Sequence, residues 1–135
     1  MTLVSAKVRA AIIYAAYEII QRESLTEPQT IRFRDSKLGN KRREGVCKQD
    51  KKGFEIILST RISEFVEDKK GNYEDKFGKT FKRMPVELSQ KRLLENMAHE
   101  VAHLRFWTHS AQHSAYSDHV LMLMNEELKK LGVIA

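Results

Sequence analysis

Residues 93–109 read LLENMAHEVAHLRFWTH and carry the pattern H-E-x-x-H from His99 to His103. Side chains four residues apart lie about 40° apart around a helix and one turn along it, so His99 and His103 can bind the same metal ion. Glu100 lies beside them, where its carboxylate can accept a proton from a metal-bound water. The stretch therefore predicts a helix that carries a metal site.

The apolar residues of the same stretch recur at helical spacing and share one face, namely Leu93, Leu94, Met97, Val101 and Leu104. His99 and His103 point to nearly the opposite face. Two histidines and a glutamate that meet away from the apolar stripe favour a metal site over histidines that only pack in a core or lie on a surface.

A third histidine, His109, follows His103 by six residues. A straight helix would carry it about 9 Å further along the axis, beyond the reach of the same ion. We therefore expect the chain to turn near Thr108, with Ser110 as the N-cap of the next helix. That turn would bring His109 back as the third ligand. A downstream glutamate, Glu126, is the alternative third ligand.

Upstream of this stretch, the pattern predicts one helix and three short strands. Apolar residues at helical spacing predict a helix over residues 3–23. Alternating apolar and charged residues predict a strand at 30–34, and branched residues predict strands at 45–47 and 54–58. We expect the three strands to form one small antiparallel sheet.

The rest of the chain predicts a loop and two helices. The polar residues 64–83 predict an exposed loop. Pro85 is expected to open the metal-site helix, which would run to about Trp107, and a last helix is expected over 110–131 with Gly132 as its C-cap. A helix, a three-stranded sheet, a loop and two more helices make an α+β domain.

Length and composition fit a single domain over residues 1–135. Hydrophobic residues make up 41% of the chain and charged residues 31%, as in an ordinary globular protein. The one cysteine, Cys47, excludes an intramolecular disulfide and a multi-cysteine zinc site. Charged residues interrupt the longest apolar stretch, 3–20, which argues against a membrane span or a signal peptide. We therefore expect a cytoplasmic protein.

The net charge of +6 is concentrated in one segment. Residues 32–52 contain nine Lys and Arg against three carboxylates, and the rest of the chain is neutral. Such a basic segment can contact nucleic acid or an acidic protein, and it can equally be a hairpin with solvated cations.

The motif His99-Glu100-Val101-Ala102-His103 followed by His109-Ser110 resembles the SprT-like zinc metallopeptidases, the compact zincin domain also found in Spartan proteases. Their pattern is H-E-x-x-H, five intervening residues, and a third His before a small residue. A looser match lies upstream, where Leu38-Gly39, Gly45-Val46-Cys47 and residues 57–62 (ILSTRI) resemble the hairpin and strand of the family. The resemblance spans about residues 30–128.

The resemblance implies a zincin-like fold and the hydrolysis of peptide bonds. It implies zinc as the metal, with His99, His103 and His109 as ligands and Glu100 as the catalytic base.

Metzincin proteases share the ligand spacing, but they place Gly where this chain has Phe106. They also need a Met-turn, whereas Met122 and Met124 lie in a predicted helix.

Other polar residues are weaker candidates for the site. His113 stands where many SprT-like proteins carry an aromatic residue, and His113 or His119 could lean over the metal. Tyr116 could stabilise an oxyanion, although a Tyr in the core or on the surface is more common. Cys47 is expected to be a small buried residue, and Trp107 is expected to pack the end of the helix.

Two functions are consistent with these features. The first is a zinc endopeptidase, in which Glu100 takes a proton from water and strand 54–58 pairs with an extended substrate. The second is a binding module in which zinc is structural and segment 32–52 binds nucleic acid or an acidic partner. A protease that acts on nucleic-acid-associated proteins would combine both.

Overall fold

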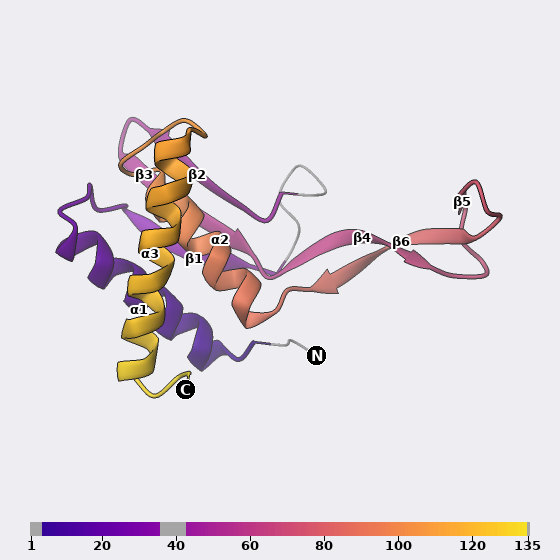
Figure 1. Ribbon diagram of the computed structural model, residues 1–135, viewed down its shortest axis with the longest axis horizontal. Coiled ribbons are helices and arrows are strands. Elements are labelled where there is room, and N and C mark those ends of the chain that lie inside the picture. Colours follow the sequence, from indigo (N-terminus) through magenta and orange to yellow (C-terminus); the bar gives the residue numbers. More distant parts are fainter. Residues whose placement is uncertain (1–3, 36–42, 135) are drawn as a thin grey trace.

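The computed structural model describes residues 4–35 and 43–134, which form a small α+β fold with three helices and two small sheets (Figure 1). The helices are α1 (Ala6–Arg22), α2 (Gln90–Ala102) and α3 (Ala111–Lys130). One sheet contains β1 (Thr30–Arg34), β2 (Gly45–Asp50) and β3 (Gly53–Ser59). The other contains β4 (Arg61–Glu67), β5 (Tyr73–Glu74) and β6 (Thr80–Glu87).

The first and last helices lie close to where the sequence places them. Ser5 caps α1 and Ser110 caps α3, each through its hydroxyl oxygen. Gly132 follows α3 with a φ of 74°, the left-handed conformation expected just beyond a helix end. None of the helices in the described part of the chain has the length and apolar character needed to cross a bilayer.

The first sheet has the strand order β1-β3-β2 and is mixed rather than antiparallel. The β2 and β3 strands form an antiparallel hairpin, whereas β1 runs parallel to β3, with Thr30 opposite Glu55. The prediction of an antiparallel sheet is therefore wrong for β1, because β1 joins the edge of β3 that the hairpin leaves free. Since β3 is paired on both sides, the prediction that residues 54–58 pair with a substrate is also wrong.

The core lies between this sheet and the helices. The α1 and α2 helices both contact the sheet, and α3 packs on α1 and α2 (Figure 1). Fully buried side chains from β3 and from all three helices meet there, including Ile19, Ile56, Leu93, Val101 and Met124. Burying such a side chain contributes about 1.5–3 kcal/mol, so this contact fixes the position of α2 against β2 and β3.

The segment expected to be a loop, residues 64–83, instead belongs to a three-stranded arm, β4-β6-β5, that projects from the body (Figure 1). The β4 and β6 strands pair from Arg61 with Glu87 to Glu67 with Phe81. Pro85 lies in β6 and does not open a helix. In the described part of the chain β6 is paired at that position with β4 alone, so the missing N–H is tolerated.

The helix that carries H-E-x-x-H is shorter than predicted. It begins at Gln90, where the Ser89 hydroxyl accepts a hydrogen bond from the backbone of Arg92, and it ends at Ala102 rather than near Trp107. His103 is its C-cap. The early end matters for the site, because it leaves room for the chain to turn before His109.

Candidate metal centre

The three predicted ligands come from the end of one helix and the turn that follows it. His99 lies in the last turn of α2, His103 caps its C-terminus, and His109 precedes Ser110, the N-cap of α3. Backbone hydrogen bonds from Phe106 to Ala102 (3.0 Å) and from Ser110 to Thr108 (2.9 Å) close the turn. The predicted turn near Thr108 therefore exists and brings His109 back to the helix.

The imidazole nitrogens of the three histidines converge. The Nε2 atom of His109 lies 3.1 Å from the Nε2 atom of His99 and 3.1 Å from that of His103. One ligand atom from each residue lies within 4.8 Å of the others. Tetrahedral zinc with bonds of about 2.05 Å holds its nitrogen ligands about 3.3 Å apart, so the spacing fits one metal ion. Three histidines close enough to bind a metal ion are therefore present, as predicted.

A backbone carbonyl fixes the orientation of His103. Its Nδ1 atom lies 3.1 Å from the carbonyl oxygen of Phe106. A carbonyl oxygen only accepts hydrogen bonds, so the proton is on Nδ1 and the lone pair of Nε2 points to the other two rings. Metal-binding histidines in proteins are oriented in the same way by their second nitrogen.

His113 packs against the three histidines but is not part of their converging group. Its side chain is only 2% exposed, and its Nε2 atom donates a hydrogen bond of 3.0 Å to the carbonyl oxygen of His99. Its ring stacks on the ring of His103, with 4.0 Å between centroids and 22° between planes. The His113 ring thus contacts all three converging histidines, an arrangement that the sequence did not predict.

Burial favours the neutral form of two of the imidazoles, His99 and His103. Burial, followed by the neighbouring His113, His103 and His109, lowers the pKa of His99 to about 4. Burial also lowers the pKa of His103, although its hydrogen bond to Phe106 opposes the shift. Neutral imidazoles are the form that binds metals, so at neutral pH these rings are ready to act as ligands.

Glu100 is a buried carboxyl beside the histidines. It is 6% exposed, and burial raises its pKa to about 7, with Arg43 and the backbone of Cys47 opposing the shift. A carboxyl with a pKa near the working pH is well suited to take up and release a proton. The predicted base is therefore buried next to the predicted ligands.

The edge strand β2 approaches Glu100 very closely at Gly45. A Cβ atom at that position would lie 2.9 Å from Glu100 Oε2 and 2.6 Å from Leu58 Cδ2. The adjacent Glu44 ties β2 to α2, since it accepts hydrogen bonds from Arg92 Nε at 2.7 Å and from Asn96 Nδ2 at 2.9 Å. The only sequence signal for this contact was a glycine in a predicted strand, which often marks a close backbone approach.

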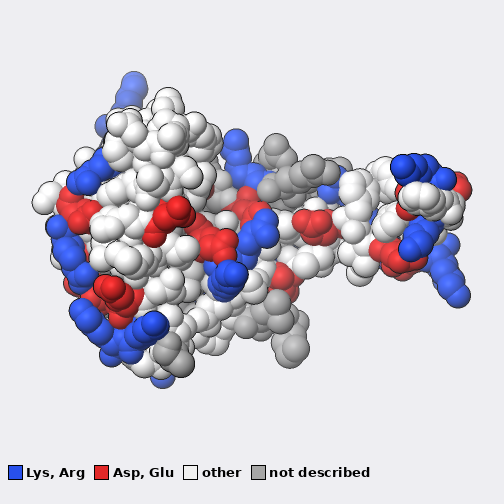
Figure 2. All heavy atoms as spheres, viewed as in Figure 1, with Lys and Arg blue, Asp and Glu red and all other residues white. Residues whose placement is uncertain are grey.

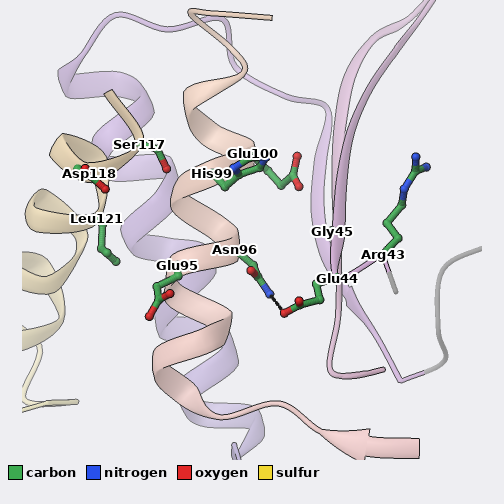
Figure 3. A pocket seen from close by; sticks show the side chains of 10 residues that line it. All are labelled: Arg43, Glu44, Gly45, Glu95, Asn96, His99, Glu100, Ser117, Asp118 and Leu121. Atoms are coloured by element: carbon green, nitrogen blue, oxygen red, sulfur yellow. Dashed lines mark hydrogen bonds between the residues drawn. The ribbon is translucent and has the colours of Figure 1, made fainter. Parts of the chain in front are cut away.

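The histidines and Glu100 face two adjoining cavities. One, of about 290 Å³, lies over the histidines and is bordered by Cys47 and Trp107. The other, of about 570 Å³, extends between α2, α3 and the start of β2 (Figure 3). His99 and Glu100 border both cavities.

The remaining candidates lie away from the histidine cluster or serve other contacts. Tyr116 donates a hydrogen bond of 2.9 Å to Glu23, and His119 lies 3.2 Å from the same carboxylate. Glu126 is exposed on α3 and does not belong to the converging group. Burial, followed by the charge of Glu100, raises the pKa of Cys47 to about 12, so its thiol stays protonated.

The basic segment 32–52 is only partly described, because residues 36–42, including Leu38-Gly39, lie outside the described residues. Two of its cations, Arg32 and Lys48, lie 3.6 and 3.3 Å from the carboxylate of Glu55 on β3. Its contact with nucleic acid stays a prediction.

Comparison with known proteins gives no relative. No family model matches this chain, and neither a curated protein nor a solved structure matches it.

We expect Gly45→Ala to displace the Glu100 carboxylate, because the new methyl group would overlap with its oxygen and with Leu58. Overpacking of this kind costs about 1–3 kcal/mol of folding free energy. Metal binding should persist, because the three histidines are unchanged, while any hydrolysis that depends on Glu100 should fall about tenfold or more. Metal content, thermal unfolding and initial rates measure the three effects. Wild-type rates in a zinc-loaded variant would show that Gly45 does not set the position of Glu100.

Two substitutions separate the contacts of His113. His113→Phe keeps a ring for His103 and loses the donor to the His99 carbonyl, whereas His113→Gln keeps a donor and loses the ring. Removing a group that orients a metal ligand typically weakens metal binding about 10- to 100-fold. We expect each variant to bind zinc at least tenfold more weakly in a chelator competition. Unchanged affinity in both would contradict a positioning role for His113.

Proposed function

We propose that this protein is a zinc-dependent metalloendopeptidase of the SprT-like kind, acting on protein substrates in the cytoplasm. The observation that carries the proposal is the convergence of three imidazole nitrogens, 3.1 Å apart in two pairs, beside a carboxyl that is 6% exposed. Three neutral nitrogen ligands with an accessible fourth side are typical of catalytic zinc sites.

The proposed chemistry divides between the metal and Glu100. Zinc bound by His99, His103 and His109 would supply Lewis acidity for a carbonyl oxygen and for water. Glu100 would accept the proton of the attacking water and deliver it to the amine that leaves. Its burial next to His99 supports this role, because a desolvated carboxylate is a stronger base than an exposed one.

The free edge of β2 is the best candidate to bind the substrate backbone. Among the residues that the structure describes, β2 pairs only with β3, and its first residues, Gly45 to Cys47, border the cavity over the histidines. An extended peptide added to that edge would gain main-chain hydrogen bonds, which give affinity with little sequence specificity. This strand replaces residues 54–58 in the proposed mechanism.

A cleavage assay tests the proposal. The protein is stripped with a chelator, reloaded with zinc and incubated with labelled, unfolded casein. We expect hydrolysis by the zinc-loaded protein, loss of hydrolysis after chelation, and recovery when zinc is returned. Casein and short fluorogenic peptides that all stay intact with zinc-loaded protein would contradict the proposal.

A further inference from the structure

The arm, residues 61–87, makes most of its contacts within itself and few with the rest of the molecule. Its strands pair with one another, and hydrogen bonds anchor its base to the body, with the backbone of Leu88 donating to Thr60 at 2.8 Å. Beyond that base the arm extends into solvent (Figure 1). Over most of its length the arm is the β4–β6 ribbon alone, and β5 adds only two residues at its far end. A two-stranded ribbon is marginally stable on its own, so its projection into solvent favours a role in binding.

Exposed apolar side chains are concentrated on the arm. Of the nine large hydrophobic residues that the structure shows as exposed, five lie there: Phe65, Tyr73, Phe77, Met84 and Val86. Phe77 is 77% exposed, Tyr73 51% and Phe65 41%. Apolar exposure that gathers on one small element, rather than being scattered singly, marks an interaction surface.

The same part of the arm is rich in cations. Residues 65–83 contain six Lys and Arg against four carboxylates, one of which, Asp68, pairs with Lys82 at 3.1 Å, and basic side chains gather at the far end of the arm (Figure 2). Lys69, Lys70, Lys76 and Lys79 are exposed. One carboxylate, Asp75, accepts hydrogen bonds of 2.9 Å from the backbone of Phe77 and of Lys79, so it shapes the turn.

Rings and cations are interleaved here. Tyr73 and Phe65 form an edge-to-face pair with centroids 5.0 Å apart, and the Arg83 guanidinium lies 4.1 Å above the Phe65 ring. The Tyr73 and Phe65 rings border a hollow of about 270 Å³ with Phe81, Glu74 and Asp75. Exposed rings that bases can stack on, beside ammonium groups that bind phosphates, are the recognition chemistry of single-stranded nucleic acid.

We propose that the end of the arm, residues 65–83, binds single-stranded nucleic acid. Tyr73 and Phe77 stack on bases, and the four exposed lysines contact phosphates. A single strand fits better than a duplex, because only unstacked bases offer their faces to aromatic side chains. Glu74 and Asp75 lie at the rim of the hollow, where carboxylates can accept hydrogen bonds from the amino groups of bases. This surface is separate from the histidine cluster, so the inference does not depend on the proposed function.

Fluorescence anisotropy with a labelled oligothymidylate, an oligouridylate and a duplex of equal length tests the inference on the full chain. We expect the single strands to bind more tightly than the duplex. Tyr73→Ala and Phe77→Ala should each weaken binding roughly tenfold, because stacking contributes about 1–3 kcal/mol per base. Replacing Lys69, Lys70 and Lys79 by Gln should lower affinity and reduce the salt dependence by about 0.7 per phosphate lost.

The matched control is Lys7→Gln with Lys129→Gln, two exposed lysines on α1 and α3 that lie outside both the arm and segment 32–52, which should change the affinity little. Thermal unfolding checks that each variant folds. The inference is overturned if single strands do not bind, or if the duplex binds as tightly and the ring variants have no effect. Preferential binding to vesicles of anionic lipid, with the same dependence on Phe77, would also overturn it in favour of a membrane contact.

Discussion

Glu100→Gln is expected to lower kcat for peptide hydrolysis by about 10²- to 10⁴-fold while zinc remains bound. The amide has nearly the shape of the carboxyl but cannot accept a proton. Since Glu100 is buried beside His99 and is not one of the converging ligands, the ligand set should survive the change. Initial rates at saturating substrate and metal content by mass spectrometry measure the two effects on the same samples.

Glu126→Gln is the matched control for this experiment. Glu126 is an exposed glutamate on α3, and it was the alternative third ligand, so the variant also tests that alternative. We expect wild-type metal content and rates. A Glu100→Gln protein that cleaves substrate as fast as the wild type would contradict the proposed role of Glu100, whatever the metal content.

Zinc is expected to raise the stability of the protein strongly. A ligand at a thousand times its Kd stabilises the folded state by about 4 kcal/mol, which for a chain of this size raises Tm by roughly 15 °C. The bound metal would link the end of α2 to the turn before α3, since its ligands are on both sides of residues 104–108. Thermal unfolding with and without zinc measures the shift.

His103→Ala and His109→Ala should remove this stabilisation, because each leaves only two of the three converging nitrogens. His119→Ala is the matched control, since this exposed histidine pairs with Glu23 and lies outside the group. We expect it to keep the full shift. An equal zinc-dependent shift in all three variants would mean that the metal binds elsewhere.

Features that depend on residues close together in the sequence were predictable. The helical spacing of His99 and His103, the N-cap Ser110 and the C-terminal Gly132 depend on local geometry, and the structure has each in the expected place. The return of His109 to the helix followed from a length argument alone, since no straight helix would place it near the other two.

Features that depend on distant parts of the chain were not predictable. The parallel pairing of β1 with β3 is decided by which edge the β2–β3 hairpin leaves free. The strands of the arm were not predicted, because charged and apolar residues are mixed on both of their faces. The sequence therefore lacks the regular alternation of apolar and polar residues that indicates a strand. The contacts of Gly45 with Glu100 and of His113 with His99 join residues that only the fold brings together.

The most direct test of the account is the metal content of protein purified without a nickel column, measured by mass spectrometry after zinc is offered and the excess removed. We expect about one zinc ion per wild-type chain, bound by the three converging histidines, and almost none in His103→Ala. A wild-type chain that retains no metal, or a His103→Ala variant that retains as much as the wild type, would contradict the central claim.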